Sequence, residues 1–128
     1  MPNLTVAILG ASADRAKFGN KSVRAHLRGG YDVYPVNPKA ETIEGLTAYP
    51  SLGEVPVNLL DRISVYLPPA VGLQLLPEIA AKKAREVWFN PGSESPELLQ
   101  KARALRINAV AGCSIVDLGL SPGEFSNS

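Results

Sequence analysis

The sequence predicts an α/β domain with a Rossmann-like, doubly wound and mostly parallel sheet of about five or six strands, with helices on both faces. Short apolar runs alternate with amphipathic stretches along the chain, and turn residues separate them. The first apolar run is nearly continuous, which is typical of a parallel strand buried on both faces. The chain has 128 residues, enough for one continuous core. We therefore expect a single domain over residues 1–120 and a flexible, frayed tail at residues 121–128.

The first part of the chain is expected to form a strand, a helix and a second strand. The strand covers residues 4–9, which are mostly apolar and are followed by a glycine. The helix begins near Gly19 or Asn20 and ends at a pair of glycines, a frequent C-terminal signal. The second strand covers residues 31–36 and stops at an Asn-Pro pair, because proline cannot continue a central ladder.

The rest of the chain repeats this alternation after an irregular region. In that region we expect a short strand near residues 47–49 and a short helix that starts at a capping box of Ser51 and Glu54. Ser95 is expected to cap a later helix that has Pro96 at its first position. The remaining strands are predicted at residues 62–67, 86–89 and 106–111, and another helix at residues 69–83. In a sheet of this kind, ligands bind beyond the C-terminal strand ends.

The composition argues against several classes of function. The formal net charge is +1, so nothing calls for nucleic acid or an anionic membrane as a partner. No apolar segment approaches the roughly 20 residues of a membrane span, and the N-terminus lacks the pattern of a secretory signal. The single cysteine, Cys113, cannot form an internal disulfide, which favours a reducing, cytoplasmic compartment. One histidine and one cysteine are too few soft ligands for a zinc site.

The end of the first strand is similar to a phosphate-binding loop. Gly10-Ala11-Ser12 follows the strand, and Lys17-Phe18-Gly19-Asn20 leads into the helix. Small residues let backbone N–H groups approach an oxyanion, and the N-terminus of a helix adds positive partial charge. The spacing departs from G-x-G-x-x-G, because the next glycine after Gly10 is Gly19. An ordinary turn between strand and helix is the alternative interpretation.

The end of the second strand discriminates between cofactors. Proteins that bind NAD usually place an acidic residue there, which accepts a hydrogen bond from the ribose. Here Asn37-Pro38-Lys39 offers a cation and no carboxylate. This disfavours NAD and suits an adenine nucleotide with an extra phosphate on its ribose, so NADP and coenzyme A both remain open.

The ends of the third and fourth strands carry weaker signals. Tyr66-Leu67-Pro68-Pro69 ends the third strand, and its prolines stiffen a turn that could cover an adenine or a pantetheine arm. Asn90-Pro91-Gly92 is a small polar turn beside the same crevice. A plain turn explains either segment equally well.

Several of these segments, taken together, resemble the CoA-binding domain family. The similar motifs are, in order, Gly10-Ala11-Ser12, Lys17-Phe18-Gly19, Val36-Asn37-Pro38-Lys39 and Tyr49-Pro50-Ser51. The family includes the N-terminal domain of the succinyl-CoA synthetase α subunit, ADP-forming acyl-CoA synthetases and small stand-alone bacterial CoA-binding proteins. The resemblance covers Val6 to about Cys113, and the ordered combination is more specific than any single motif.

The resemblance implies a stand-alone protein that binds coenzyme A, free or acylated, across the C-terminal strand ends. The residues that would then surround the phosphates are Gly10, Ala11, Ser12, Lys17, Phe18, Gly19 and Asn20. Asn37, Pro38 and Lys39 would lie at the adenosine end, with Lys39 near the ribose phosphate. Leu67 and Pro68 would line the flank of the cofactor, and Asn90 and Cys113 would lie nearer the pantetheine.

No catalytic residue is evident in the sequence. The related synthetases use a phosphorylated histidine in a further domain, and this chain is expected to end before such a domain. Its one histidine, His26, is predicted to lie on a helix surface. No base is evident beside Cys113, which is expected to be a small buried or half-buried residue. An NADP-dependent enzyme and a Rossmann-like interaction module without a ligand are the alternative functions, and a homodimer or a partner enzyme remains open.

Overall fold

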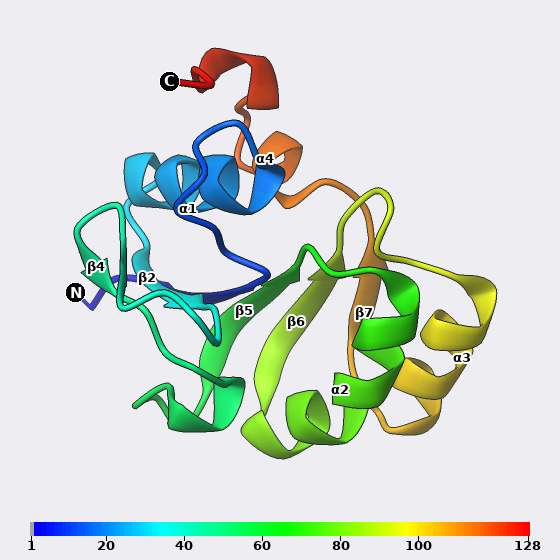
Figure 1. Ribbon diagram of the computed structural model, residues 1–128. Coiled ribbons are helices and arrows are strands. Elements are labelled where there is room, and N and C mark those ends of the chain that lie inside the picture. The colour runs from blue at the N-terminus through cyan, green and yellow to red at the C-terminus, as the bar shows by residue number, and fades with distance from the viewer. Residues whose placement is uncertain (1) are drawn as a thin grey trace.

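The computed structural model describes residues 2–128, in which a parallel sheet carries helices on both sides (Figure 1). The sheet has five strands in the order β2-β1-β5-β6-β7. Their bounds are Thr5–Leu9 (β1), Asp32–Val36 (β2), Leu60–Val65 (β5), Ala84–Phe89 (β6) and Ala109–Ala111 (β7). Every neighbouring pair of strands is parallel. The predicted α/β class with a Rossmann-like, mostly parallel sheet is therefore confirmed.

The helices divide into two pairs. Helices α1 (Phe18–Arg28) and α4 (Ser114–Asp117) pack against each other on one face of the sheet. Helices α2 (Pro69–Lys82) and α3 (Pro96–Ala104) pack against each other on the opposite face (Figure 1). Two short 3-10 turns, η1 (Leu52–Glu54) and η2 (Pro122–Glu124), complete the fold. Within residues 2–128, no helix has the length and apolar character that crossing a membrane requires.

Edge strand β2 is covered along part of its length. A small antiparallel ribbon of β3 (Thr42–Ile43) and β4 (Leu46–Thr47) lies beside it, close to the short strand predicted near residues 47–49. After the ribbon, the backbone N–H of Tyr49 donates to the carbonyl of Pro35 at 2.9 Å, and the N–H of Asn37 donates to the carbonyl of Tyr49 at 2.9 Å. Pro35 thus sits in an edge strand at a position where its missing N–H breaks no ladder bond.

The strand order creates a topological switch point at β1. From β1 the chain crosses to β2 on one side through α1, and it then returns to β5 on the other side of β1. The crossovers that flank β1 therefore run over opposite faces of the sheet, and the loops that follow β1 and β5 diverge. A crevice forms beyond the carboxyl ends of the strands at such a point.

Two predicted helix caps have different outcomes. Ser95 caps α3 as expected: its side chain accepts a hydrogen bond from the N–H of Leu98 at 3.1 Å, and Pro96 is the first helical residue. The capping box expected at Ser51 is wrong, because the side chain of Ser51 accepts no capping bond. The N–H of Gly53, which a cap would take, donates instead to the Glu78 carboxylate of α2 at 3.1 Å.

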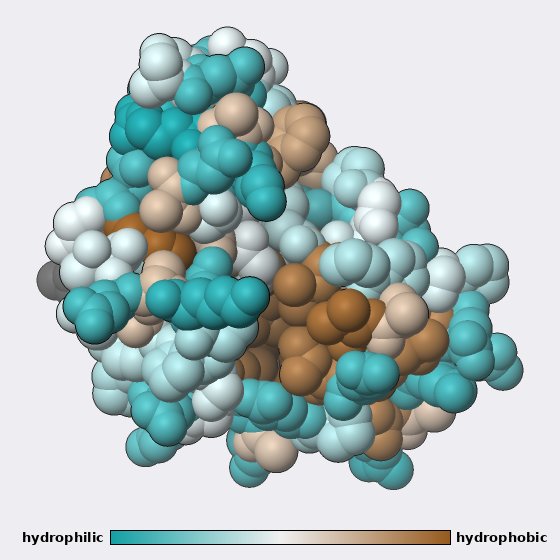
Figure 2. Space-filling model, viewed as in Figure 1, coloured by the Kyte–Doolittle hydropathy of each residue, from teal (hydrophilic) through white to brown (hydrophobic). Residues whose placement is uncertain are grey.

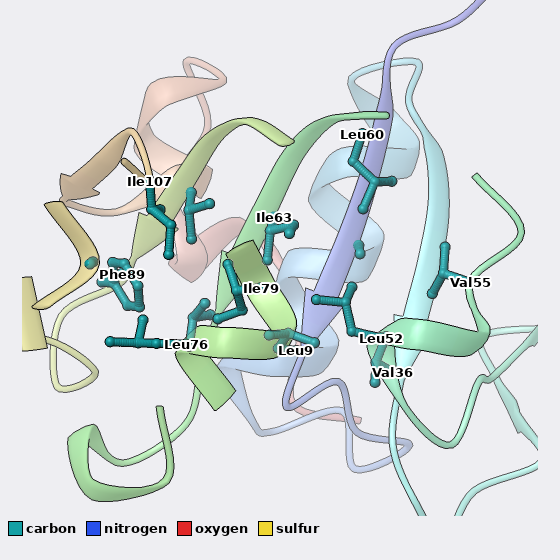
Figure 3. Close-up of a cluster of buried hydrophobic side chains, with 14 of the residues drawn as sticks. Leu9, Val36, Leu52, Val55, Leu60, Ile63, Leu76, Ile79, Phe89 and Ile107 are labelled. Atoms are coloured by element: carbon teal, nitrogen blue, oxygen red, sulfur yellow. The ribbon is translucent and has the colours of Figure 1, made fainter. Parts of the chain in front are cut away.

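The main core lies between the sheet and helices α2 and α3. Strand β5 points Ile63 and Val65 into this core, and both are fully buried. Leu76 and Ile79 of α2 meet Ile63 there, and Figure 3 shows these three side chains directed toward one another. Phe89 of β6 is also fully buried in this cluster. Burial of so much apolar surface is the main stabilising contribution on this face.

The opposite face of β5 and β6 carries a buried cation. The side chain of Arg62 is 4% exposed and donates to Glu86 of β6 at 2.7 Å and to Asp117 of α4 at 2.5 Å. Its guanidinium also lies 5.0 Å from the ring centroid of Trp88. Burial lowers the pKa of Arg62, but the hydrogen bonds that Arg62 donates to Asp117 and Glu86 outweigh it, and the net shift of the pKa is upward. The ion pair to Asp117 ties α4 to the sheet.

His26 of α1 belongs to the same cluster, so its predicted surface location is wrong. Its side chain is fully buried, with Nδ1 2.8 Å from the carbonyl of Ser22 and Nε2 3.3 Å from Nη1 of Arg62. A carbonyl can only accept and a guanidinium can only donate, so the neutral ring carries its proton on Nδ1. Burial lowers the pKa of His26 to about 4, and this keeps the ring neutral at pH 7.

The C-terminal residues, where the sequence predicted a flexible tail, pack against α1 and α4. Phe125 is 4% exposed and packs with Ala25 of α1 and Ile115 of α4. Ser121 and Glu124 form a capping box at η2. Helix α4 itself was not predicted, and β7 is shorter than the strand expected at residues 106–111. An aromatic side chain near the end of the chain holds this segment against α1.

Candidate functional site

A cavity of about 450 Å³ lies beyond the carboxyl ends of β1, β2 and β5, at the switch point of the sheet. The predicted site residues that line it are Gly10, Ala11, Ser12, Lys17, Asn37, Pro38 and Leu67. Its remaining lining consists of Leu9, Val36, Pro50, Ser51, Leu52, Tyr66, Val71, Leu75 and Glu78. Two segments separated by a long stretch of sequence, the loop after β1 and helix α2, therefore face each other across this cavity.

Two glycines hold the loop after β1 against its neighbours. Gly10 has a φ of +82°, and a Cβ on it would overlap the carbonyl oxygen of Tyr66 at the end of β5. A Cβ on Gly19 would overlap the carbonyl oxygen of Gly10. Both positions therefore require glycine because backbone segments touch, whether or not a ligand approaches. The loop is pressed between the end of β5 and the first turn of α1.

The first turn of α1 gives one end of the cavity a positive character. Lys17 is the N-cap residue and lines the cavity, and no acidic residue occupies the first turn. The helix has 11 residues, so its first N–H groups carry the positive end of the macrodipole. Phe18 points elsewhere: it is 59% exposed and does not line the cavity. An anion is favoured at this end on charge alone.

Asn20 lies behind the loop, which it holds by a hydrogen bond, and it does not line the cavity. It is fully buried, and its Nδ2 donates to the carbonyl of Ser12 at 2.9 Å and to Glu44 at 3.0 Å. Its Oδ1 accepts from Nε of Arg24 at 2.8 Å. The Asn20 hydrogen bond is the largest influence that lowers the pKa of Glu44; an ion pair with Arg15 adds to it, and burial opposes both. Asn20 is a positioning residue.

Asn37 joins the ends of β1 and β2. Its Nδ2 donates to the carbonyl of Ala11 at 2.9 Å, and its Oδ1 accepts from the backbone N–H of Lys39 at 2.8 Å and of Ala40 at 3.1 Å. Pro38 lines the cavity next to it. The side chain of Lys39 is exposed and lies outside the lining, one residue from the rim.

Asn90 and Cys113 also lie outside the cavity lining, as does Pro68. Asn90 is buried, and its Nδ2 donates to Ser64 Oγ and to the carbonyl of Val65, each at 2.9 Å. Its Oδ1 accepts from the N–H of Ser114 at 2.8 Å, so it fastens the start of α4 to the sheet. Cys113 is half-buried and serves as the N-cap of α4 without a side-chain capping bond.

The wall formed by α2 was missed by the sequence reasoning. Val71, Leu75 and Glu78 face the cavity from successive turns of that helix. Val71 is 39% exposed although it belongs to the apolar stripe of α2. Figure 2 shows hydrophobic residues gathered over α2 beside a hollow in this face. An apolar residue exposed on a helix that borders the switch point is the signal that could have identified this wall.

Tyr66, which the sequence placed at the end of the third strand without assigning it a contact with the cofactor, also lines the cavity. Its hydroxyl lies 3.0 Å from Ser114 Oγ, which in turn lies 2.7 Å from Ser64 Oγ. Burial raises the pKa of Tyr66, and hydrogen bonds from these serines oppose the shift. The tyrosine therefore links the cavity to the polar network beneath α4.

Two further observations favour the cavity at the switch point over other parts of the molecule. A hollow of about 630 Å³ lies at the start of α3, lined by Glu94, Ser95 and Arg103 among others, but no strand end opens into it. In the part of the chain that the structure describes, no three His, Cys, Asp or Glu side chains are grouped so that they could hold a metal ion. The cavity at the switch point is therefore the candidate site.

The fold and this cavity define a Rossmann-like α/β domain whose candidate site lies at the switch point of a parallel sheet. The chain belongs to the CoA-binding domain family, whose sequence pattern matches residues 4–119. The resemblance drawn from the motifs is thus confirmed as a family relationship.

Solved structures of similar proteins agree with this assignment. A conserved hypothetical protein from Pyrococcus furiosus is 34% identical, with a TM-score of 0.78, over 91% of this chain and 99% of that one. A protein from Thermus thermophilus is 31% identical, with a TM-score of 0.82, over 90% of this chain and 87% of that one. The dinucleotide-forming acetyl-coenzyme A synthetase 1 of Candidatus Korarchaeum cryptofilum is 25% identical, with a TM-score of 0.70, over 85% of this chain but 26% of that enzyme.

Proposed function

We propose that this protein binds coenzyme A, free or acylated, in the cavity at the switch point, and that it acts as a binding protein without catalysis of its own. The observation that carries the proposal is the cavity itself: a chain of the CoA-binding domain family places Gly10–Ser12, Lys17, Asn37 and Leu67 around one hollow. The lining combines small residues and a lysine from the loop after β1 with apolar side chains of α2, and a phosphorylated adenosine with an amide arm carries both kinds of group.

The pyrophosphate is assigned to the end at Lys17. Gly10, Ala11 and Ser12 line the cavity there, α1 begins beside them, and Lys17 adds a full charge. Glu78 is a carboxylate in the lining at α2, and it would repel phosphate at its own end. These two charges favour a single orientation for an anionic ligand.

The apolar part of the ligand is assigned to the wall between η1 and α2. Leu52, Leu67, Val71 and Leu75 line this wall, and burying part of an adenine or a pantetheine chain there removes apolar surface from water. The lysine at the loop and the apolar side chains of this wall both support the proposal. Lys39 lies beyond the rim, so its contact with a ribose phosphate would be made at the exposed edge of the site.

A calorimetric and thermal-shift panel tests the proposal. Coenzyme A, dephospho-CoA, acetyl-CoA, NAD and NADP are compared, and binding of the CoA compounds alone is the expected result. Ligand at about 100 times its Kd stabilises the native state by roughly 2.7 kcal/mol, which is readily detected. Binding of NADP with CoA inert would favour the enzyme alternative, and no response to any ligand would favour an interaction module.

Lysine variants locate the phosphates. Lys17→Ala is expected to weaken coenzyme A roughly tenfold, because it removes a charge that faces the cavity. Lys21→Ala is the matched control, because Lys21 lies outside the lining, with its Nζ 5.8 Å from the Phe18 ring centroid. Lys39→Ala is expected to weaken coenzyme A more than dephospho-CoA. Equal losses for both compounds would refute a contact between Lys39 and the ribose phosphate.

A further inference from the structure

The C-terminal segment, residues 121–128, lies across α1 and is fixed there by arginines of that helix. Phe125 is 4% exposed, and its ring centroid lies 4.5 Å from the guanidinium carbon of Arg28 and 5.6 Å from that of Arg24. Arg28 also pairs with Glu124 at 3.7 Å. The segment is thus bound by apolar packing on one side and by stacked cations on the other.

Arg24 connects this segment to the loop that lines the cavity. Its Nη2 donates to the carbonyl of Ser126 at 2.8 Å and to the carbonyl of Arg15 at 2.9 Å. Its Nε donates to Oδ1 of Asn20 at 2.8 Å, and Nδ2 of Asn20 donates to the carbonyl of Ser12 at 2.9 Å. Ser12 faces the cavity. An unbroken series of hydrogen bonds therefore runs from the C-terminal segment to the cavity wall.

A second connection runs through Arg15, which belongs to the loop itself. Nε of Arg15 donates to the carbonyl of Ser128 at 3.0 Å, and Nη1 of the same side chain pairs with Glu44. The other oxygen of Glu44 accepts from Nδ2 of Asn20 at 3.0 Å. The two connections converge on Asn20, and each arginine is held at one end by a backbone carbonyl of the C-terminal segment.

We propose that the C-terminal segment positions the loop between Gly10 and Lys17, and that it sets the affinity of the cavity without touching the ligand. No residue of the segment lines the cavity, so its influence passes through Arg24 and Asn20. The inference rests on the proposed function for its effect on affinity. Its effect on the loop is independent of any ligand.

The geometry of a guanidinium is required for this role. Arg24 uses two nitrogens to reach Asn20, Ser126 and the carbonyl of Arg15 at once. A lysine would keep the positive charge but would offer one point donor instead of a planar fork. Arg24→Lys therefore separates the positioning role from a general attraction of phosphate by positive charge.

Two variants in the full chain test the proposal. Phe125→Ala releases the segment from α1, whereas Arg24→Lys breaks the series of hydrogen bonds and leaves Phe125 packed against Ala25, Ile115 and Arg28. Both are expected to weaken coenzyme A roughly 5- to 20-fold, about 1 to 1.8 kcal/mol, which is close to the net contribution of a single hydrogen bond. Both are also expected to speed amide hydrogen exchange in residues 11–17, relative to the central strands.

Glu124→Gln is the matched control. It removes the charge that pairs with Arg28 but retains an oxygen that can accept from the N–H of Ser121, as Glu124 does at 2.6 Å. Unchanged affinity and unchanged exchange in residues 11–17 are expected.

The outcomes separate this inference from the proposed function. If the unaltered protein does not bind coenzyme A, the proposed function fails, and loop exchange still decides whether the segment positions the loop. Arg24→Lys with unaltered exchange in residues 11–17 would overturn the inference. Tighter binding of coenzyme A by Phe125→Ala would also overturn it, because the segment would then oppose the ligand.

Discussion

Strands β5 and β6 send alternate side chains to the two faces of the sheet, and the two faces hold opposite kinds of interior. Toward α2 and α3 they point Ile63, Val65 and Phe89, which are fully buried among other apolar groups. Toward α1 and α4 they point Arg62 and Ser64, which are buried as well. Both Arg62 and these apolar side chains are buried, yet the apolar interior is held by shape, whereas Arg62 is held by carboxylates that reach the surface.

The difference shows where specificity enters this fold. An apolar side chain accepts any neighbour of suitable volume, so the face of α2 and α3 depends on filled space. Arg62 requires neighbours that are negatively charged and can accept its hydrogen bonds. It therefore fixes where Asp117, and hence α4, must lie. The face with α1 and α4 also supports the loop of the cavity, because α1 supplies Asn20 and Arg24. The polar face therefore carries the arrangement of the candidate site.

The largest effect is expected from a void on the apolar face. Phe89→Ala removes a fully buried ring and should reduce the free energy of unfolding by about 4 kcal/mol. Chemical denaturation monitored by circular dichroism measures this loss. Leu59→Ala is the control, because Leu59 is 47% exposed and should cost little. Equal costs for the two variants would contradict the assignment of the core.

A smaller loss is expected when the charge on the polar face is removed. Arg62→Met should reduce the free energy of unfolding by about 2 kcal/mol, because Glu86 and Asp117 lose their partner but are 33% and 42% exposed, so water solvates part of their charge. The triple variant Arg62→Met, Glu86→Gln, Asp117→Asn should recover most of that loss, since no unpaired charge remains. A triple variant as unstable as the single one in denaturant would show that the polar face is not governed by pairing.

The polar face should also make stability depend on pH. The pKa of His26 is about 4 in the folded protein and 6.5 in the unfolded chain, so the unfolded chain binds more protons between these values. Stability contributed by the neutral ring is complete above pH 6.5 and is lost as the pH falls toward 4. Lowering the pH from 8 to 5 should cost about 2 kcal/mol. Denaturation curves of His26→Asn should lack this component; an identical pH dependence in both proteins would rule it out.

The smallest effect belongs to a polar group at the boundary of the apolar face. Ser95→Ala removes the cap of α3 and should reduce the free energy of unfolding by about 1 kcal/mol. The loss is small because the N–H of Leu98 can donate to water instead. Ser95→Thr retains the hydroxyl and should cost less. If thermal melts show a loss as large as that of Arg62→Met, the Ser95 hydroxyl contributes more than a cap at an exposed helix end, and this prediction is wrong.

Elements with local signals were predictable from the sequence, and those that depend on distant contacts were not. The Ser95-Pro96 start of α3 lies entirely within neighbouring residues, and it was predicted correctly. Helix α4 is one turn long and depends on Asp117 reaching Arg62 in a distant strand. The burial of His26 follows from two partners, one of which, Arg62, is far along the chain. No local pattern records such a pairing.

The dependence on distant contacts also explains why the sequence predicted only part of the candidate site. Motifs located the loop after β1 and the Asn-Pro pair after β2, and both border the cavity. They could not distinguish a residue that faces the cavity, such as Lys17, from one that braces it, such as Asn20. A polar side chain can either face a ligand or brace a loop, and only the direction in which it points distinguishes the two roles. The wall of α2 required knowledge of which helix crosses the switch point.

Pro35 has a consequence for how two copies of the protein could meet. Alternate residues of β2 point their backbone groups away from β1, and of these Val33 and Pro35 lie within the strand. Pro35 has no N–H to offer, and its carbonyl is already taken by Tyr49. Addition of a further strand beside Pro35 would therefore lack both of its backbone hydrogen bonds, which disfavours this edge relative to β7 at the opposite edge of the sheet.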